Sequence, residues 1–194
     1  MTTFKILVDG YARKAKEGWE ATPNTVLIED SGKKILVDPG MNEGLLLKGL
    51  EKEGLSTNDI NLIFLTHHHI DHILNIRISP KTDLCDGGDM NADGKIFCYE
   101  GKIPGTNIQV VKTPGHATEH ACLIIDTEKG KVCIGGDLVW WVDGVEQKTD
   151  RESLINLKDP CAFDMVKLKE SRKKIIDQVD WIIPGHGKMF KVVK

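Results

Sequence analysis

The chain has 194 residues, of which 40% are hydrophobic and 28% are charged, with 19 glycines and 7 prolines. These proportions are typical of a globular domain and exclude a disordered, collagen-like or repeat-array chain. The 26 basic residues are nearly balanced by 29 acidic ones, so the net charge is −3. Overall charge therefore gives no reason to expect nucleic acid or an anionic membrane as a partner.

The length predicts a single domain over residues 1–194. The first residues lack the charged and apolar regions of a secretory signal, and no apolar run reaches the roughly 18 residues of a membrane span. We therefore expect a cytoplasmic protein without a membrane partner. The cysteines are odd in number and widely spaced, which predicts reduced core thiols rather than a disulfide framework. They are Cys85, Cys98, Cys122, Cys133 and Cys161.

The first half of the chain alternates short strands with one helix. Aliphatic and β-branched runs predict strands at 4–8, 25–29, 34–37 and 61–66. Residues 30–32 read Asp-Ser-Gly and predict the turn of a hairpin. Leucines at helical spacing before Gly54 predict a short amphipathic helix over 42–52.

The second half of the chain is also rich in strands. Prolines and glycines divide residues 77–106 into hairpin-sized pieces. Strands are predicted at 108–112, 121–126, 132–134 and 181–183, and a helix at 163–178. A helix thus closes each half of the chain, and this order favours two packed sheets with helices outside.

A histidine-rich motif follows the predicted strand at 61–66. Its sequence, Thr-His-His-His-Ile-Asp-His over residues 66–72, contains the pattern His-x-His-x-Asp-His. In an extended segment, alternate side chains share one face, so His67, His69 and Asp71 point one way. His68 and Ile70 then point the other way, and we expect His68 to serve packing. The motif supplies half of a metal site locally.

Three further candidate ligands lie where predicted strands meet loops. They are His116 after Pro-Gly, Asp137 after Gly-Gly, and His186 after Pro-Gly. Glycine and proline let the backbone turn sharply and leave the next side chain in a cleft. A histidine run alone can be an exposed loop, and a lone histidine after Pro-Gly can be a turn residue. Five histidines and two aspartates in ordered positions favour a metal site instead.

The order of these motifs resembles that of the metallo-β-lactamase superfamily, which includes glyoxalase II and transfer-RNA-processing ribonucleases. Residues 38–40, Asp-Pro-Gly, are similar to the strand-end Asp-x-Gly of that family. The resemblance spans nearly the whole chain and implies an α+β fold, an αββα four-layer sandwich of two mixed sheets with helices outside. It assigns one metal ion to His67, His69 and His116, a second ion to Asp71, His72 and His186, and a bridging position to Asp137.

The resemblance implies two divalent ions per chain, preferably zinc, with iron or manganese as alternatives. Imidazole and carboxylate suit these ions, and a close pair can generate a bridging hydroxide near neutral pH. Asp71 and Asp137 are the expected catalytic residues, because they would orient that hydroxide. Two divalent ions, two aspartates and one hydroxide sum to a charge of about +1, which favours a small-molecule or anionic substrate and a developing oxyanion.

These features imply a metal-dependent hydrolase of an ester, thioester, lactone or phosphodiester. His69 stands where the family's flavodiiron oxidoreductases have Glu, which favours hydrolysis over reduction of dioxygen or nitric oxide. A mononuclear iron persulfide dioxygenase has a similar His-x-His-x-Asp-His segment and is one alternative. A small metal-dependent ribonuclease is another, although the acidic net charge does not favour nucleic acid as the partner. A binding module without catalysis is disfavoured by the complete ligand set.

Several residues near the motifs have two interpretations. Asp38 is expected to accept a hydrogen bond from a ligand histidine and fix its tautomer, rather than only to form a turn. His120 lies four residues after His116, as in a run of glyoxalase II, and can shuttle a proton or line the pocket. We favour a strand histidine near solvent instead. Trp140, beside Trp141, is either a pocket wall or part of a core pair.

Two other patterns are given ordinary structural interpretations. Residues 89–100 match the spacing of a calcium-binding loop, but prolines and glycines on both flanks prevent the paired helices of such a site, so we predict a β-hairpin. The basic segment 167–174 can track phosphates, but the acidic net charge favours a solvated helix face. Exposed edge strands make a homodimer plausible.

Overall fold

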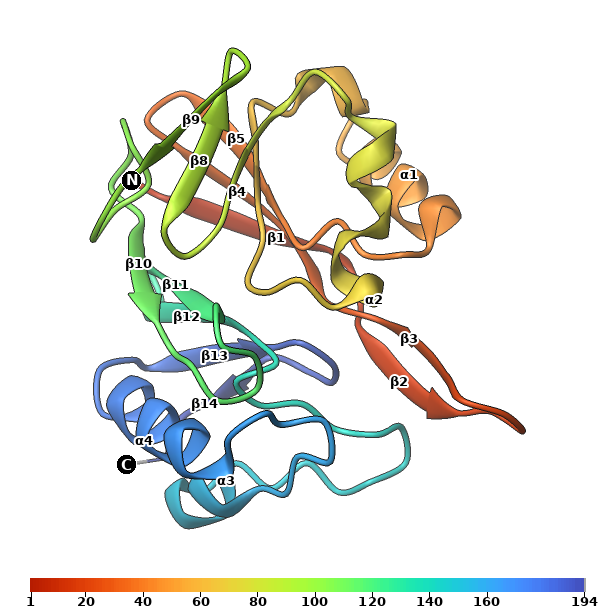
Figure 1. Cartoon of the computed structure of the whole chain (residues 1–194), viewed down its shortest axis with the longest axis vertical. Helices are drawn as coiled ribbons and strands as arrows, with labels where there is room; N and C mark the ends of the chain where they lie inside the picture. The colour runs from red at the N-terminus through yellow and green to blue at the C-terminus, as the bar shows by residue number, and fades with distance from the viewer. Residues whose placement is uncertain (194) are drawn as a thin grey trace.

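The structure of the chain is a computed structural model that describes residues 1–193. Within that range the strands form two large mixed sheets that pack face to face, and a separate small hairpin. Helices cover the outer side of each large sheet (Figure 1). The layers run helix, sheet, sheet, helix, which confirms the predicted αββα four-layer sandwich.

The first sheet has the order β1-β4-β5-β6-β7-β8-β9. Its strands are β1 (Thr3–Val8), β4 (Thr25–Asp30), β5 (Lys33–Val37), β6 (Leu62–Phe64), β7 (Asp83–Cys85), β8 (Asp89–Ala92) and β9 (Lys95–Cys98). Strands β5, β6 and β7 run parallel, and the other neighbours are antiparallel. Parallel neighbours place their carboxyl ends at one edge of the sheet, where α2 (Ile70–Ile73) begins.

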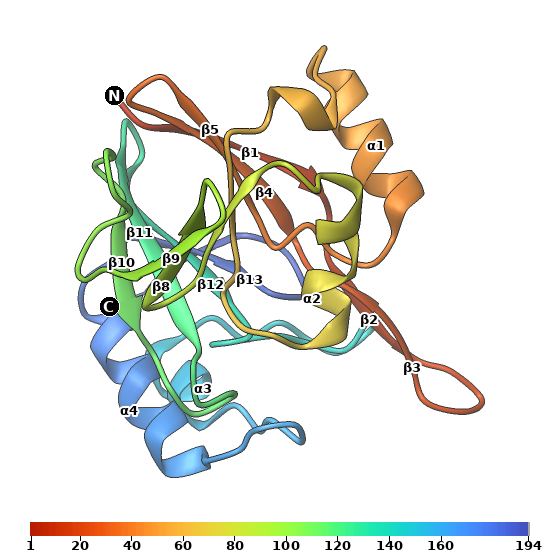
Figure 2. The ribbon, with the colours of Figure 1, turned by 45° about the horizontal axis from the view of Figure 1, so that its top comes forward.

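The second sheet has the order β10-β11-β12-β13-β14. Its strands are β10 (Gln109–Lys112), β11 (Ala121–Thr127), β12 (Gly130–Gly136), β13 (Trp181–Pro184) and β14 (Phe190–Lys191). Strands β12 and β13 run parallel. Helices α3 (Arg151–Asn156) and α4 (Met165–Ile176) pack on the outer face of this sheet. Figure 2 shows them on the side of the molecule opposite α1 (Glu43–Lys52).

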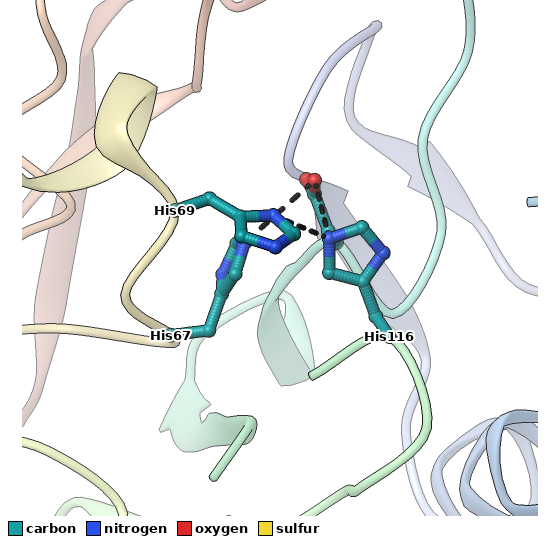
Figure 3. Close-up of side chains that lie close together, drawn as sticks. His67, His69 and His116 are labelled. Carbon is teal, nitrogen blue, oxygen red and sulfur yellow. Dashed lines mark hydrogen bonds and ion pairs between the residues drawn. The ribbon is translucent and has the colours of Figure 1, made fainter. Parts of the chain in front are cut away.

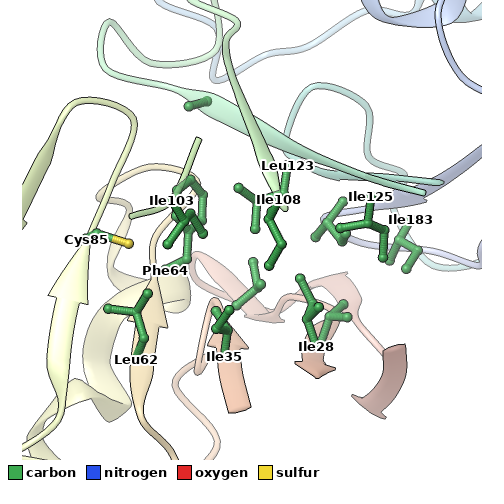
Figure 4. Close-up of a cluster of buried hydrophobic side chains, with 14 of the residues drawn as sticks. Ile28, Ile35, Leu62, Phe64, Cys85, Ile103, Ile108, Leu123, Ile125 and Ile183 are labelled. Carbon is green, nitrogen blue, oxygen red and sulfur yellow. The ribbon is translucent and has the colours of Figure 1, made fainter. Parts of the chain in front are cut away.

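The alternation of side chains along each strand produces the layers. On β4, Val26 and Ile28 enter the core between the sheets, whereas Leu27 between them packs under α1. On β11, Leu123 and Ile125 enter the same inner core, and their neighbours face α4. Figure 4 shows this inner core, where aliphatic side chains from both sheets meet. Strands covered on both faces read as continuous apolar runs, which is why the sequence revealed them.

Most elements predicted from the apolar pattern are confirmed within a few residues, including the helix α1. Its first turn is capped by the side chain of Asn42, which accepts a hydrogen bond from the backbone of Leu45 at 3.1 Å. The prediction missed the short helices α2 and α3 and the short strand β14, because elements of two to six residues contain too few apolar positions to show a period.

None of the helices within residues 1–193 has the length and apolar composition needed to span a membrane.

Strands β2 (Tyr11–Lys14) and β3 (Trp19–Thr22) form a separate hairpin that the sequence did not predict. Both views show it extending away from the sandwich (Figures 1 and 2). Arg13 and Lys14 at its tip are exposed, and so is Glu20 on the facing strand. A two-stranded ribbon that is solvated on most of its surface has no clear apolar alternation, and its strands therefore read as loop.

The calcium-like segment forms the predicted β-hairpin. Strand β8 pairs antiparallel with β9, and the turn between them contains Asp93 and Gly94, both with positive φ. The cysteine prediction is correct in that the thiols are free, but only Cys85, Cys122 and Cys133 are buried. Cys98 and Cys161 are exposed, because the first lies on the edge strand β9 and the second in the loop before α4.

A buried carboxylate joins the two sheets at the turn between β4 and β5. Asp30 is 5% exposed and accepts hydrogen bonds from the Thr2 hydroxyl at 2.7 Å, the Asn107 backbone at 2.8 Å and the Ser31 hydroxyl at 2.8 Å. Burial raises the pKa of this carboxyl, but these hydrogen bonds outweigh it and lower the pKa to about 2. Each bond favours the ionised form.

A carboxyl with a depressed pKa stabilises the folded state above its unfolded pKa of about 4, and this stabilisation is lost as the pH falls toward the folded value. We expect Asp30→Asn to cost about 1–2 kcal/mol at pH 7, with the difference from wild type shrinking between pH 5 and pH 2. Urea unfolding of the metal-free protein across this range measures it, with the exposed Asp126→Asn as the control. A difference that stays constant with pH would contradict this interpretation.

Candidate metal centre

The predicted ligands gather at one end of the sandwich, where strands of both sheets finish. His67 lies just beyond β6, Asp137 follows β12, and His186 lies just beyond β13. His67 is fully buried next to Asp137. Asp137 and His186 line a cavity of about 260 Å³ together with His69, Asp71 and His116. Its apolar walls are formed by Ala12, Trp19, Ala21, Met41, Ile70 and Trp140. Segments from position 67 to position 186 therefore converge on one place, as the sequence predicted.

One group of candidate ligands consists of His67, His69, His116 and Asp137. One ligand atom from each lies within 4.8 Å of every other. The His116 Nε2 atom is 2.9 Å from His69 Nδ1 and 3.2 Å from Asp137 Oδ2. Figure 3 shows the three rings turned toward one another and toward the carboxylate. This spacing matches the donor set that the resemblance assigned to one ion.

A second group consists of Asp71, His72 and His186, whose ligand atoms also lie within 4.8 Å of one another. The His186 Nε2 atom is 3.3 Å from Asp71 Oδ2 and 3.6 Å from Asp137 Oδ1. The His72 Nε2 atom is 3.4 Å from the same Asp137 oxygen. Asp137 thus lies between the two groups, with Oδ2 toward the first and Oδ1 toward the second.

The alternation argument required the histidine motif to stay extended over its whole length, and the structure shows that it does not. The chain turns into α2 at Ile70, so Asp71 and His72 lie on a helical turn. A helix places successive residues about 100° apart, which lets both neighbours face the second group. His68 points away from the ligands as expected, but it is exposed rather than packed, and its Nε2 atom lies 3.2 Å from Asp86 Oδ2. Ile70 was expected to point the same way as His68, and this is wrong, because Ile70 lines the cavity.

Asp38 contacts one candidate ligand histidine directly and a second one through the Thr66 hydroxyl. Its Oδ2 atom accepts a hydrogen bond from His72 Nδ1 at 2.8 Å and another from the Thr66 hydroxyl at 2.7 Å. The hydroxyl oxygen in turn lies 3.1 Å from His67 Nδ1. Acceptors placed at Nδ1 keep the proton there and leave Nε2 free to bind a metal ion. Asp38 therefore lies where it would fix the tautomer of His72 when a metal ion binds.

His186 is held by the base of the β2–β3 hairpin. Its Nδ1 atom lies 2.9 Å from the Tyr11 carbonyl and 2.9 Å from the Thr22 carbonyl. Backbone carbonyls only accept hydrogen bonds, so Nδ1 carries the proton and Nε2 faces Asp71 and Asp137. The hairpin that the sequence missed therefore orients a ligand as well as lining the cavity.

Two ring nitrogens and one carboxylate oxygen that face the centre lack hydrogen-bond partners within the described residues. His67 Nε2, His72 Nε2 and Asp137 Oδ1 are buried and unpaired there. Buried polar atoms are nearly always paired, because leaving them unpaired costs free energy. Several such atoms that converge from imidazole and carboxylate groups fit divalent ions of the zinc, iron or manganese type.

The electrostatics of the metal-free centre agree with this fit at Asp137 and His67. Burial raises the pKa of the Asp137 carboxyl, but the neighbouring His72 and His186 outweigh burial and hold its pKa well below the usual value. Burial lowers the pKa of His67 well below its usual value. A metal ligand must be a carboxylate or a neutral imidazole, and both groups are in that form. His72 is not, because burial lowers its pKa but Asp38 and Asp137 outweigh burial and raise that pKa well above its usual value. A metal ion would have to displace this proton.

Close packing explains the glycines beside the ligands. A Cβ atom on Gly185 would lie 1.8 Å from Asp137 Oδ1, and one on Gly115 would lie 2.3 Å from the Leu168 backbone. Gly115 and Gly136 also have positive φ, which favours glycine. The sequence argument treated these glycines only as turn residues; at Gly185 the requirement is space for the neighbouring carboxylate.

The structure tests the two interpretations given for His120 and for Trp140. His120 is fully buried rather than near solvent on a strand, so that expectation is wrong. Its Nδ1 atom lies 2.8 Å from the Thr113 hydroxyl, and burial lowers its pKa to about 3. A buried neutral ring behind His67 is poorly placed to shuttle protons. Trp140 lines the cavity, whereas Trp141 belongs to the core under α4.

The basic segment 167–174 was expected to be solvated, but one of its basic residues is buried. Arg172 is buried, and its Nε atom donates to the Leu138 carbonyl at 2.7 Å. Lys167, Lys173 and Lys174 remain exposed along α4. The predicted solvated face is therefore confirmed for these three lysines and wrong for Arg172, and Lys169 is half-buried.

Several residues of the site were missed from the sequence. Trp19 and Met41 line the cavity although neither lies in a ligand motif. Cys161 lines it too, and the nearby Asp159 carboxylate contacts His116 at 2.7 Å. These residues come from the hairpin, from turns and from the loop before α4, where no periodic pattern marks them. The run Asp-Pro-Cys at 159–161 was the only signal for the last two.

Comparison with known sequences identifies the class. A family profile of the metallo-beta-lactamase superfamily matches residues 19–81. Metallo-beta-lactamase domain-containing protein 1 of Mus musculus is 30% identical over 207 positions, covering 100% of this chain and 76% of that protein. Its counterpart in Rattus norvegicus is 29% identical, covering 96% of this chain and 74% of that protein.

Solved structures show the same fold. A metallo-beta-lactamase-type protein of Thermotoga maritima, 22% identical, aligns with a TM-score of 0.69 over 98% of this chain and 99% of that one. The dizinc quorum-quenching lactonase AidC, 19% identical, aligns with a TM-score of 0.62 over 91% and 78%. This chain belongs to the metallo-β-lactamase superfamily. With its clustered histidines and aspartates, it is a hydrolase of that fold.

The packing at Gly185 gives a direct test of the centre. We expect Gly185→Ala to displace the Asp137 carboxylate and to lower zinc affinity by at least about tenfold, since precise ligand placement sets affinity. Equilibrium competition against a chromophoric chelator measures this. Gly44→Ala is the matched control, because a Cβ atom at that position on α1 would meet only Asn42 Oδ1, at an ordinary contact distance of 3.7 Å. It is expected to leave zinc affinity unchanged. Equal zinc affinity in the two variants would contradict the packing argument.

Proposed function

We propose that this chain hydrolyses carboxylic esters, thioesters or lactones that carry an apolar acyl group, using two divalent ions, preferably zinc. The observation that carries the proposal is the position of two ligand groups at the base of a cavity with apolar walls. The base supplies the chemistry and the walls select the substrate. Iron or manganese would suit the same ligands.

The walls favour a neutral apolar group over a phosphodiester. The described residues that line the cavity include no lysine or arginine. Phosphate recognition normally relies on such side chains, because they neutralise the anion. The positive charge of a loaded centre would act only at the base, on the oxygen that gains charge during hydrolysis. Trp19, Met41 and Ile70 instead offer apolar surface to an acyl chain.

The residues have distinct roles in this reaction. Bound divalent ions would supply Lewis acidity and lower the pKa of water toward neutrality. Asp137 contacts both ligand groups and would keep the attacking water between them. Asp71 lines the cavity, and its carboxylate would help to orient that water. Asp38 and the hairpin carbonyls hold the histidines in the ligating tautomer throughout.

The names of similar structures support a carbonyl substrate. AidC is named a dizinc quorum-quenching lactonase, and another similar structure is an N-acyl homoserine lactone hydrolase with its product bound at the catalytic metal centre. That hydrolase is 20% identical and aligns with a TM-score of 0.60 over 95% of this chain and 92% of its own. A lactone with an acyl chain combines the ester bond and the apolar group that this cavity would accommodate.

A substrate panel tests the proposed function. Protein loaded with zinc is assayed on p-nitrophenyl esters, a γ-lactone, a thioester and bis-p-nitrophenyl phosphate, with Asp137→Ala as the inactive control. We expect kcat/KM for the best ester or lactone to exceed that for the phosphodiester by at least about 100-fold, because no cation in the walls would hold the phosphate. Preference for the phosphodiester would favour the ribonuclease alternative. One iron per chain with oxygen uptake on a persulfide would favour the dioxygenase.

The exposed Trp19 gives a sharper test of the substrate class. Each buried methylene contributes about 0.8 kcal/mol, so kcat/KM is expected to rise with acyl length in the wild type. Trp19→Ala removes part of the wall, and we expect roughly a five- to tenfold lower kcat/KM for a decanoyl ester with little change for an acetyl ester. Ile96→Ala on the distant edge strand β9 is the matched control. An equal loss for both esters would contradict acyl recognition by this wall.

A further inference from the structure

The loop between α3 and α4 contributes a carboxylate to the metal centre that no ligand motif includes. Asp159 Oδ2 lies 2.7 Å from His116 Nδ1, and its side chain is fully buried. Its other oxygen, Oδ1, accepts a hydrogen bond from the Cys161 backbone at 2.9 Å. Both oxygens are therefore held, and the carboxylate has little freedom to turn away from the histidine.

An ionised carboxylate only accepts hydrogen bonds, so the proton of a neutral His116 ring is kept on Nδ1. The opposite nitrogen, Nε2, is then unprotonated and points at His69 and Asp137, at 2.9 and 3.2 Å. Without Asp159, the proton could move to Nε2 and the ring could rotate. Metal-binding histidines commonly depend on such a carboxylate for both tautomer and orientation.

The backbone of this loop is joined to the loop that carries His116. Phe163 N donates to the His116 carbonyl at 3.1 Å, and Asp164 N donates to the Gly115 carbonyl at 2.8 Å. Asp164 also caps α4, since its side chain accepts hydrogen bonds from the first turn of that helix. The position of Asp159 relative to His116 is therefore set by the start of α4.

Arg172 on α4 secures the same loop from the other side. Its Nη1 atom donates to the Leu157 carbonyl at 2.5 Å, and its Nε atom donates to the Leu138 carbonyl at 2.7 Å. Leu157 precedes Asp159 by two residues, and Leu138 follows Asp137 directly. A single buried guanidinium thus connects the Asp159 loop to the strand end that carries Asp137.

We infer that Asp159 is a positioning residue that holds His116 in its ligating tautomer and so sets the metal affinity of the group His67, His69, His116 and Asp137. Asp38 has the corresponding role for His72 in the other group. The inference rests on the metal centre of the proposed function and not on its substrate. A chain that acts on another substrate class would still show the effect on metal binding.

Zinc binding measures the effect without any assay of activity. Apo-protein is titrated with zinc alone in the presence of a chromophoric chelator, comparing wild type with Asp159→Asn. We expect about 10- to 100-fold weaker binding of one zinc ion per chain, with the other ion less affected. Asp177→Asn is the matched control, because Asp177 pairs with Arg151 at the surface and its loss is expected to leave both ions unchanged.

A merely structural role would give a different result. In that case Asp159→Asn would lower the stability of the metal-free protein to urea, while the zinc affinity of the folded protein stayed at the wild-type value. That result would overturn the inference. In a background of His116→Ala, we expect the substitution at Asp159 to have no further effect on zinc affinity, since the two act through one bond.

A measurement on the wild type keeps the inference testable if Asp159→Asn does not fold. Nitrogen-15 NMR of the histidine rings in zinc-loaded protein identifies which nitrogen carries the proton. We expect His116 to be protonated at Nδ1 and bound through Nε2. Protonation at Nε2 with binding through Nδ1 would overturn the inference.

Discussion

The hydrogen bonds of the buried Asp38 side chain are the interactions on which the rest of the metal centre depends. Asp38 follows β5, its backbone N–H donates to the Phe64 carbonyl of β6, and its side chain accepts hydrogen bonds from Thr66 and His72. The residue has a φ of 48°, an uncommon conformation that must be stabilised by its surroundings. One buried carboxylate thus aligns two parallel strand ends and orients ligands of both groups.

The sandwich explains why distant segments meet at this carboxylate. Parallel pairs in both sheets direct their carboxyl ends to the same end of the molecule, and the ligands follow those ends. Four candidate ligand rings, those of His67, His72, His116 and His186, are then each held at Nδ1 by a neighbouring oxygen. The Thr66 hydroxyl, the Asp38 and Asp159 carboxylates and the hairpin carbonyls fill this role. The apolar cavity walls come largely from the β2–β3 hairpin, which is separate from the two large sheets.

The sequence predicted the parts of this arrangement that are local. Buried strands such as β4 and β11 read as apolar runs, and the ligand motifs lie directly after strands or sharp turns, so their order was visible. Asp159 was not predictable, because it lies 43 positions beyond His116 and meets it only through the packing of α4. The β2–β3 hairpin was missed because it is largely solvated. His120 was misplaced because a polar residue at a strand start gives no sign of which layer covers it.

Anomalous X-ray scattering from crystals grown with zinc tests the central claim most directly. Data on both sides of the zinc absorption edge locate the ions without any assumption about the reaction. We expect two peaks per chain, one among His67, His69 and His116 and one among Asp71, His72 and His186, with Asp137 between them. An absence of peaks, or peaks only at surface residues, would contradict the assignment of this cluster as a pair of metal sites.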